Sequence, residues 1–117
     1  MKVLIVEDDQ IYREGMEWWL TEIGYEVVGS AANGASAMEL LWQTHPDLVT
    51  MDGELEHKES GLAVARRIRK EDPKVIIVII SATEGLAFEG RSIYKGDIES
   101  LESLRGLLAA QLPLSSR

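Results

Sequence analysis

Short apolar runs alternate along this chain with segments in which apolar residues recur at helical spacing, and this alternation limits the fold more than any other feature. Residues 75–80 are an unbroken aliphatic run of β-branched residues, which is typical of a strand buried on both faces. Strands are expected at residues 3–6, 26–31, 47–51, 75–80 and 92–94. Because each parallel strand needs a crossover, the pattern predicts an α/β protein with a doubly wound five-stranded parallel sheet.

Helical periodicity and capping residues predict four helices between and after these strands. They are expected at residues 10–23, between the cap Asn33 and Pro46, at residues 61–71 after the cap Ser60, and between the cap Asp97 and Pro113. The basic stretch from Arg66 to Lys70 lies on the third of these helices, where we interpret it as a solvated face.

Composition excludes several classes of protein. A length of 117 residues fits one domain, residues 1–117, and 12 basic against 20 acidic side chains give a net charge of −8. Such an acidic chain would repel nucleic acid. The absence of cysteine excludes disulfides, thiolate metal sites and cysteine catalysis. No apolar segment is long enough for a membrane span or a signal peptide, so we expect a cytoplasmic protein.

Polar residues that can carry chemistry follow four of the expected strands. They are the acidic run Glu7, Asp8 and Asp9 after the first strand, Asp52 after the third, Ser81 after the fourth and Lys95 after the fifth. The carboxyl ends of parallel strands meet at one edge of the sheet, so these side chains are expected to converge. Carboxylates that share a crevice repel one another, and a hard cation such as Mg²⁺ relieves the repulsion.

This set of residues resembles the receiver domain of bacterial two-component response regulators. The acidic pair lies in Val6-Glu7-Asp8-Asp9, the acceptor in the segment from Pro46 to Asp52, and the hydroxyl in Ser81-Ala82, so the resemblance covers nearly the whole chain. It implies a flavodoxin-like fold with strand order 2-1-3-4-5.

The resemblance also implies roles for individual residues. Asp52 would take a phosphoryl group from a histidine kinase or phosphotransfer protein. Glu7, Asp8, Asp52 and the backbone carbonyl of Glu54 would hold Mg²⁺, and Ser81 and Lys95 would contact the phosphoryl group. Such a chain is no enzyme beyond assisting its own phosphorylation and dephosphorylation. Its output would lie in an effector protein or a fused output domain outside this chain, and a homodimer is a further option.

The sequence departs from the family pattern in three places. The loop after Asp52, residues 53–61, lacks proline and adds three glutamates. Ser81 and Lys95 are only 14 positions apart, which leaves about nine residues (83–91) for a crossover that usually needs a dozen or more. The fourth helix is therefore expected to be shortened or missing, and one face of residues 76–80 to be poorly covered and open to a partner. Ser92 occupies the usual position of an aromatic switch residue, and Tyr94 should point to the face opposite Lys95.

The sequence is also compatible with two other functions. The short crossover and Ser92 fit a pseudo-receiver that binds a protein partner or dimerises without phosphorylation. The segment Asp52-Gly53-Glu54 also suggests a phosphatase that uses Asp52 as nucleophile, but this class has a cap domain and an aspartate where Glu54 lies.

Overall fold

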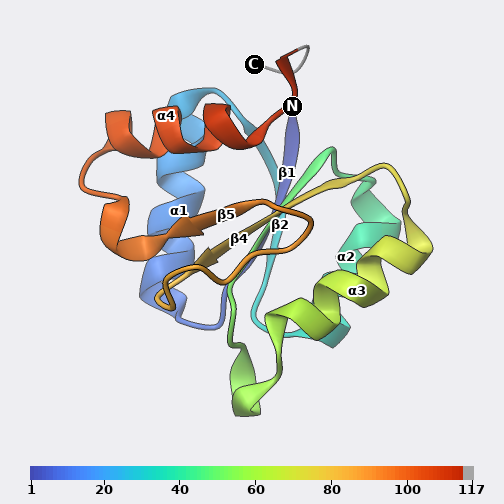
Figure 1. Cartoon of the computed structure of the whole chain (residues 1–117). Coiled ribbons are helices and arrows are strands. Elements are labelled where there is room, and N and C mark those ends of the chain that lie inside the picture. The colour runs from blue at the N-terminus through green and yellow to red at the C-terminus, as the bar shows by residue number, and fades with distance from the viewer. Residues whose placement is uncertain (115–117) are drawn as a thin grey trace.

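The computed structural model describes residues 1–114 as one five-stranded parallel sheet with the order β2-β1-β3-β4-β5 (Figure 1). The strands are β1 (Lys2–Val6), β2 (Glu26–Ala31), β3 (Leu48–Met51), β4 (Ile76–Ser81) and β5 (Ser92–Tyr94). The predicted fold class and strand order are confirmed. That residues 1–117 form a single domain stays a prediction, and its last residues, 115–117, lie outside the described part.

Four α-helices connect or follow the strands: α1 (Gln10–Ile23), α2 (Gly34–Thr44), α3 (Gly61–Glu71) and α4 (Leu101–Gln111). The expected caps Asn33 and Ser60 accept hydrogen bonds from the backbone N–H of Ser36 and Ala63, respectively. The expected cap Asp97 is wrong, because Asp97 lies in a 3-10 turn, η2 (Lys95–Asp97). Ser100 caps α4 instead, in a reciprocal pair of hydrogen bonds with Ser103.

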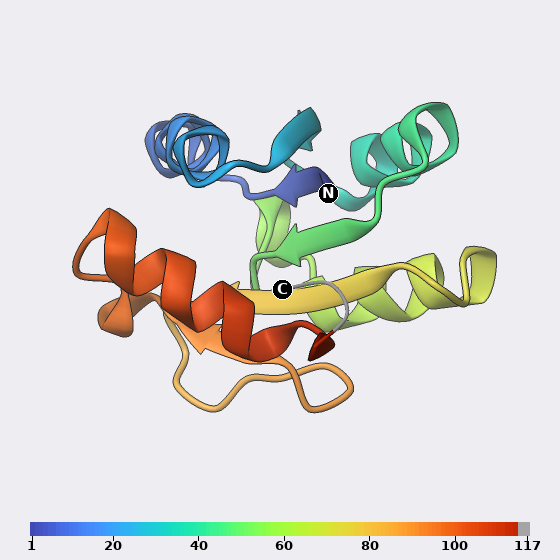
Figure 2. The ribbon, with the colours of Figure 1, turned by 90° about the horizontal axis from the view of Figure 1, so that it is seen from above.

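The helices form two layers, with α1 and α4 on one face of the sheet and α2 and α3 on the other (Figure 2). Alternate residues of β1 serve the two layers: Val3 and Ile5 contact the first, whereas Leu4 and Val6 contact the second. All four side chains are buried. A strand that is apolar at every position is therefore what two helical layers require.

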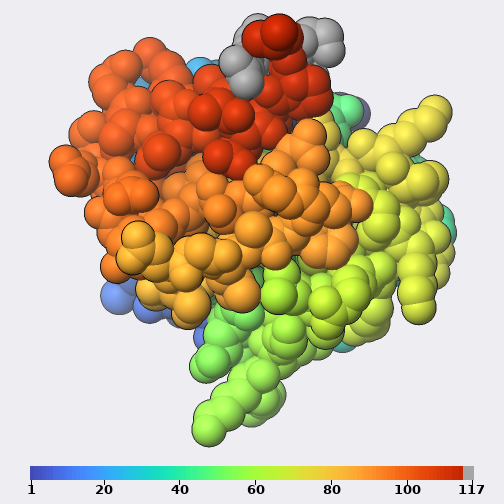
Figure 3. Space-filling model, in the orientation of Figure 1, coloured from blue at the N-terminus to red at the C-terminus, as the bar shows by residue number. Residues whose placement is uncertain are grey.

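Residues 82–91 connect β4 to β5 without a helix, as the short spacing predicts. The expectation of a poorly covered sheet face is wrong, however, because both faces of β4 are buried: Val78 and Ile80 on one face are 0% and 4% exposed, and Ile77 and Ile79 on the other are 0% exposed. Leu86 and Phe88 of the connection pack against the same core cluster as these isoleucines. Figure 3 shows the orange segment that contains this connection lying between α4 and α3.

Large exposed apolar side chains occur on the helices instead. Among the described residues, Ile11 and Trp18 on α1 and Trp42 on α2 are each more than half exposed. Of the α-helices in residues 1–114, none combines the length and the apolar character that a membrane crossing needs.

Candidate functional site

Adjacent strands place Glu7 and Asp52 at the same level of the sheet edge. Val6 pairs with Met51 in the parallel register, so the residue that follows each strand emerges at one height. The backbone N–H of Asp52 donates to the carbonyl of Val6 at 2.9 Å, which continues the pairing one residue beyond β3. The expected convergence of the strand ends is therefore present for these two acids.

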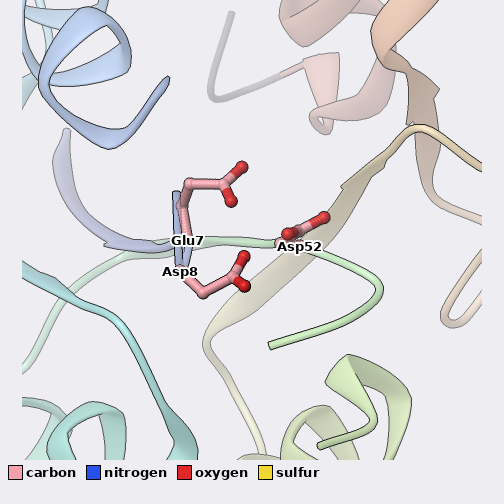
Figure 4. Close-up of side chains that lie close together, drawn as sticks. All are labelled: Glu7, Asp8 and Asp52. Carbon is pink, nitrogen blue, oxygen red and sulfur yellow. The ribbon is translucent and has the colours of Figure 1, made fainter. Parts of the chain in front are cut away.

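Three carboxylates gather at this edge (Figure 4). Glu7, Asp8 and Asp52 each offer one carboxylate oxygen, and these oxygens lie within 4.8 Å of one another. Glu7 and Asp52 are buried, and Asp8 is half-buried. Oxygen donors with this charge suit a hard divalent cation such as Mg²⁺, which usually takes one or two carboxylates and keeps several waters.

Lys95 reaches the same carboxylates from the end of β5. Its Nζ donates to Oε1 of Glu7 at 2.7 Å and lies 3.4 Å from Oδ1 of Asp52. The lysine side chain is only 18% exposed. The structure thus brings the fifth-strand cation to the acceptor carboxylate, as expected from the sequence.

Burial and the neighbouring charges shift the pKa values of the ionisable groups in this cluster. Desolvation raises the pKa of Glu7 to about 7, against the lowering effect of the hydrogen bond from Lys95. Desolvation also raises the pKa of Asp52, again against the charge of Lys95. Burial alone would lower the pKa of Lys95, but its hydrogen bond to Glu7 and the charge of Asp52 outweigh burial and raise it. One ammonium does not compensate the carboxylates fully, so the donor set fits an additional cation.

Ser81 is buried at the end of β4, beside the backbone that follows Asp52. A Cβ added to Gly53 would lie 2.7 Å from Oγ of Ser81, so a larger residue there would displace the Ser81 side chain. Oγ of Ser81 accepts a hydrogen bond from the backbone N–H of Thr83 at 3.0 Å. Its hydroxyl proton is not used in that bond.

The loop between β3 and α3 is folded back on itself and held close to Asp52. The two ends of the loop pair through an isolated bridge between Glu54 and Ser60, and the N–H of Gly61 donates to the carbonyl of Gly53 at 2.9 Å. A Cβ on Gly61 would overlap the carbonyl oxygen of Asp52. The side chain of Glu54 is exposed, and its carbonyl as a metal ligand stays a prediction.

Two residues of α1 belong to the site, although no strand-end signal marks them. Arg13 donates from one guanidinium nitrogen to the carbonyls of Glu7 at 2.8 Å and Asp8 at 3.4 Å, and so holds the backbone of the acidic pair. The ring of Tyr12 lies under Nζ of Lys95, at 4.2 Å from the ring centroid. Both lie in the first turn of α1 after its cap Asp9, and no motif in the sequence marks either residue.

The chain belongs to the response regulator receiver domain family, whose model matches residues 3–99. This result confirms the resemblance of the strand-end residues to receiver domains.

Individual relatives agree with the family assignment. The chain is 31% identical over 118 residues to the Regulator of RpoS of Escherichia coli K12, covering 95% of this chain and 34% of that protein. It therefore spans about a third of that relative's length. It is 38% identical over 81 residues to the chemotaxis protein CheY of Thermotoga maritima, covering 69% of this chain and 67% of CheY.

A solved structure agrees with the fold over nearly its full length. The response regulator protein TrrA of Thermotoga maritima, in complex with Mg²⁺ and BeF, superposes with a TM-score of 0.80 at 27% identity. The match covers 95% of this chain and 98% of the TrrA chain.

Proposed function

We propose that this receiver domain accepts a phosphoryl group on Asp52 from a histidine kinase or a phosphotransfer protein. The observation that carries the proposal is the meeting of Glu7, Asp8 and Asp52 within 4.8 Å, with the Lys95 ammonium beside two of them. A site of this kind catalyses transfer mainly by positioning groups and neutralising charge.

In the proposed reaction, an oxygen of the Asp52 carboxylate attacks phosphorus. The new O–P bond forms as the N–P bond of the donor phosphohistidine breaks, and the leaving imidazole nitrogen takes up a proton. An ionised carboxylate is already a competent nucleophile, so no separate base is needed. The product is an acyl phosphate with a charge of about −2 at the edge of the sheet.

The neighbouring residues would divide the remaining tasks. Glu7, Asp8, Asp52 and the Glu54 carbonyl would hold Mg²⁺, which when bound neutralises charge on phosphoryl oxygens. The similar protein TrrA was solved in complex with Mg²⁺ and BeF, which supports Mg²⁺ as the cation of this site. Lys95 would contact a second phosphoryl oxygen, and the Ser81 hydroxyl would donate its unused proton to a third.

Intact-mass measurement after incubation with a small acyl phosphate and Mg²⁺ tests the proposal. The wild type should gain one phosphoryl mass and Asp52→Asn none. Asp47→Asn is the matched control, because Asp47 is an exposed aspartate at the other end of β3 that accepts from the backbone N–H of Lys2. No gain in the wild type, or the same gain in Asp52→Asn, would contradict the proposal.

The absence of a helix between β4 and β5 favours a second candidate, a pseudo-receiver that binds a protein partner or a second copy without phosphorylation. Amide NMR spectra distinguish the two. In a switching receiver, acyl phosphate should move the resonances of residues 82–91, and Asp52→Asn should abolish the change. Unchanged resonances there, despite full phosphorylation, would favour the pseudo-receiver.

The setting of the domain is also part of the proposal. A phosphoryl signal of this kind would be delivered to an effector protein or to a fused output domain outside this chain, in the cytoplasm. The domain itself would act on no substrate other than its own acyl phosphate.

A further inference from the structure

Tyr12 lies between the acidic site and an apolar groove on the neighbouring surface. Tyr12 lines a small cavity together with Glu7 and Asp52. It also lines a groove of about 310 Å³ with Lys95, Met16, Trp19 and other, mostly apolar residues. The ring is therefore a wall of the site that α1 supplies.

The contacts of Lys95 show what this wall does. The ammonium meets the ring of Tyr12 at 4.2 Å from its centroid, Glu7 at 2.7 Å and Asp52 at 3.4 Å. Lysine has a long flexible stem, and here it follows a strand of only three residues and begins a 3-10 turn. The backbone around Lys95 therefore has little regular structure that could hold this long side chain in one position.

An aromatic face supplies the missing support. The negative face of a tyrosine ring attracts an ammonium within about 6 Å of its centroid, and the attraction strengthens when water is excluded. The attraction needs the ring face and not the hydroxyl group. The ring of Tyr12 on α1, far from Lys95 in sequence, is thus a third contact of the Lys95 ammonium beside Glu7 and Asp52.

We propose that Tyr12 is a positioning residue, whose ring face holds the Lys95 ammonium toward Asp52 so that it meets an incoming phosphoryl group. This inference rests on the proposed phosphoryl transfer to Asp52. It adds a residue to the site that the acidic pair, the acceptor, the hydroxyl and the lysine do not include.

Two readouts on the same variants test the role of the ring. Ring current from Tyr12 should shift the side-chain methylene resonances of Lys95 in the metal-free protein, and Tyr12→Leu should abolish the shift. Tyr12→Leu should also slow phosphorylation by acyl phosphate about three- to tenfold. Tyr12→Phe keeps the ring face and should retain both the shifted resonances and a rate within about twofold of the wild type.

Controls separate this role from simple packing. Tyr25→Leu makes the same change at a half-buried tyrosine that packs against the same core cluster and precedes β2, at the other end of the sheet, and it should leave the rate unchanged. If Tyr12→Leu does not fold, Tyr12→Met offers a flexible apolar replacement for the same two readouts.

Two results would contradict the positioning role of Tyr12. Wild-type rate and wild-type Lys95 resonances in Tyr12→Leu would overturn it, as would a Tyr12→Phe variant as slow as Tyr12→Leu. The spectra need no phosphoryl donor. An unphosphorylated wild type would therefore refute the proposed function, while unshifted Lys95 resonances in the wild type would refute the contact.

Discussion

The two crossovers on either side of β4 both cover the sheet with apolar side chains, but they do so with different structures. Between β3 and β4, helix α3 buries Val64, Ala65 and Ile68 against the sheet. Between β4 and β5, residues 82–91 form no helix, and the partly buried Leu86 and Phe88 cover the adjoining surface. The strands are nevertheless parallel and in register in both cases, with Met51 opposite Ile79 and Ser81 opposite Tyr94.

This difference shows that strand register, and not the helical layer, fixes the positions of the functional residues. Ser81 and Lys95 both lie next to the short crossover, and Lys95 still reaches Asp52. The short crossover has fewer buried apolar groups, so we expect it to open locally at a lower free energy than α3.

Alanine at one glycine of each crossover should give the largest contrast. At Gly61 the new Cβ would overlap the Asp52 carbonyl oxygen, so we expect Gly61→Ala to lower the free energy of unfolding by about 3 kcal/mol. At Gly85 the space is open and only the positive φ of 81° is strained, so the loss should be about 1 kcal/mol. Urea unfolding measures both losses of unfolding free energy, and equal losses would contradict the expected difference between the two crossovers.

Truncating one apolar side chain in each crossover should give a contrast of similar size. Ile68→Ala removes a fully buried side chain and should cost about 3 kcal/mol. Leu86 is only partly buried, so Leu86→Ala should cost about 1 kcal/mol. The same unfolding measurement applies, and a cost at Leu86 as large as at Ile68 would show that the short crossover is as tightly packed as the helical one.

A glutamate anchors the helical crossover to a neighbouring helix. Oε1 of Glu59 accepts from the N–H of Gly34, at the start of α2, at 2.7 Å. Because this bond places a charge at a helix N-terminus, Glu59→Ala should cost about 1 to 2 kcal/mol in unfolding free energy. Glu71→Gln, at the exposed end of α3, is the control and should change little. A loss of unfolding free energy as small as that of the control would contradict the stabilising role of Glu59.

Glu89 anchors the short crossover more weakly. Its carboxylate accepts two hydrogen bonds from Arg69, but the side chain is 42% exposed, so solvent screening limits the pair to about 0.5 kcal/mol in a double-mutant cycle. The hydrogen bonds from Arg69 lower the pKa of Glu89 below its ordinary value of 4.5. A lowered folded-state pKa means that this stabilisation is present above pH 4.5 and is lost as pH falls through the lowered value. A coupling energy that is the same at low pH would contradict this origin.

Much of the fold could be predicted because local signals agree with the tertiary structure. The β-branched run at residues 75–80 and the caps Asn33 and Ser60 appear where the sequence places them. The cap of α4 was mispredicted because Asp97 and Ser100 are both good capping residues, and the 3-10 turn that carries Lys95 decides between them.

Leu86 and Phe88 are the large apolar residues that the sequence offers to cover β4, but that two such residues suffice could not be read from the sequence. Leu86 and Phe88 reach the core because the connection turns at Gly85, Glu89 and Gly90, which all have positive φ. The acidic cluster was predictable, since carboxyl ends of parallel strands share an edge. The contacts of Tyr12 and Arg13 were not, because they depend on the angle at which α1 leaves β1.

The proposed phosphoryl transfer depends most directly on Glu7, Asp8 and Asp52 sharing one divalent cation, and urea unfolding with and without Mg²⁺ tests this. Mg²⁺ at about ten times its dissociation constant should raise the unfolding free energy of the wild type by about 1.4 kcal/mol. Asp8→Asn should lose most of that increase, whereas Asp47→Asn should keep it. No increase in the wild type, or an equal increase in Asp8→Asn, would contradict the shared cation site.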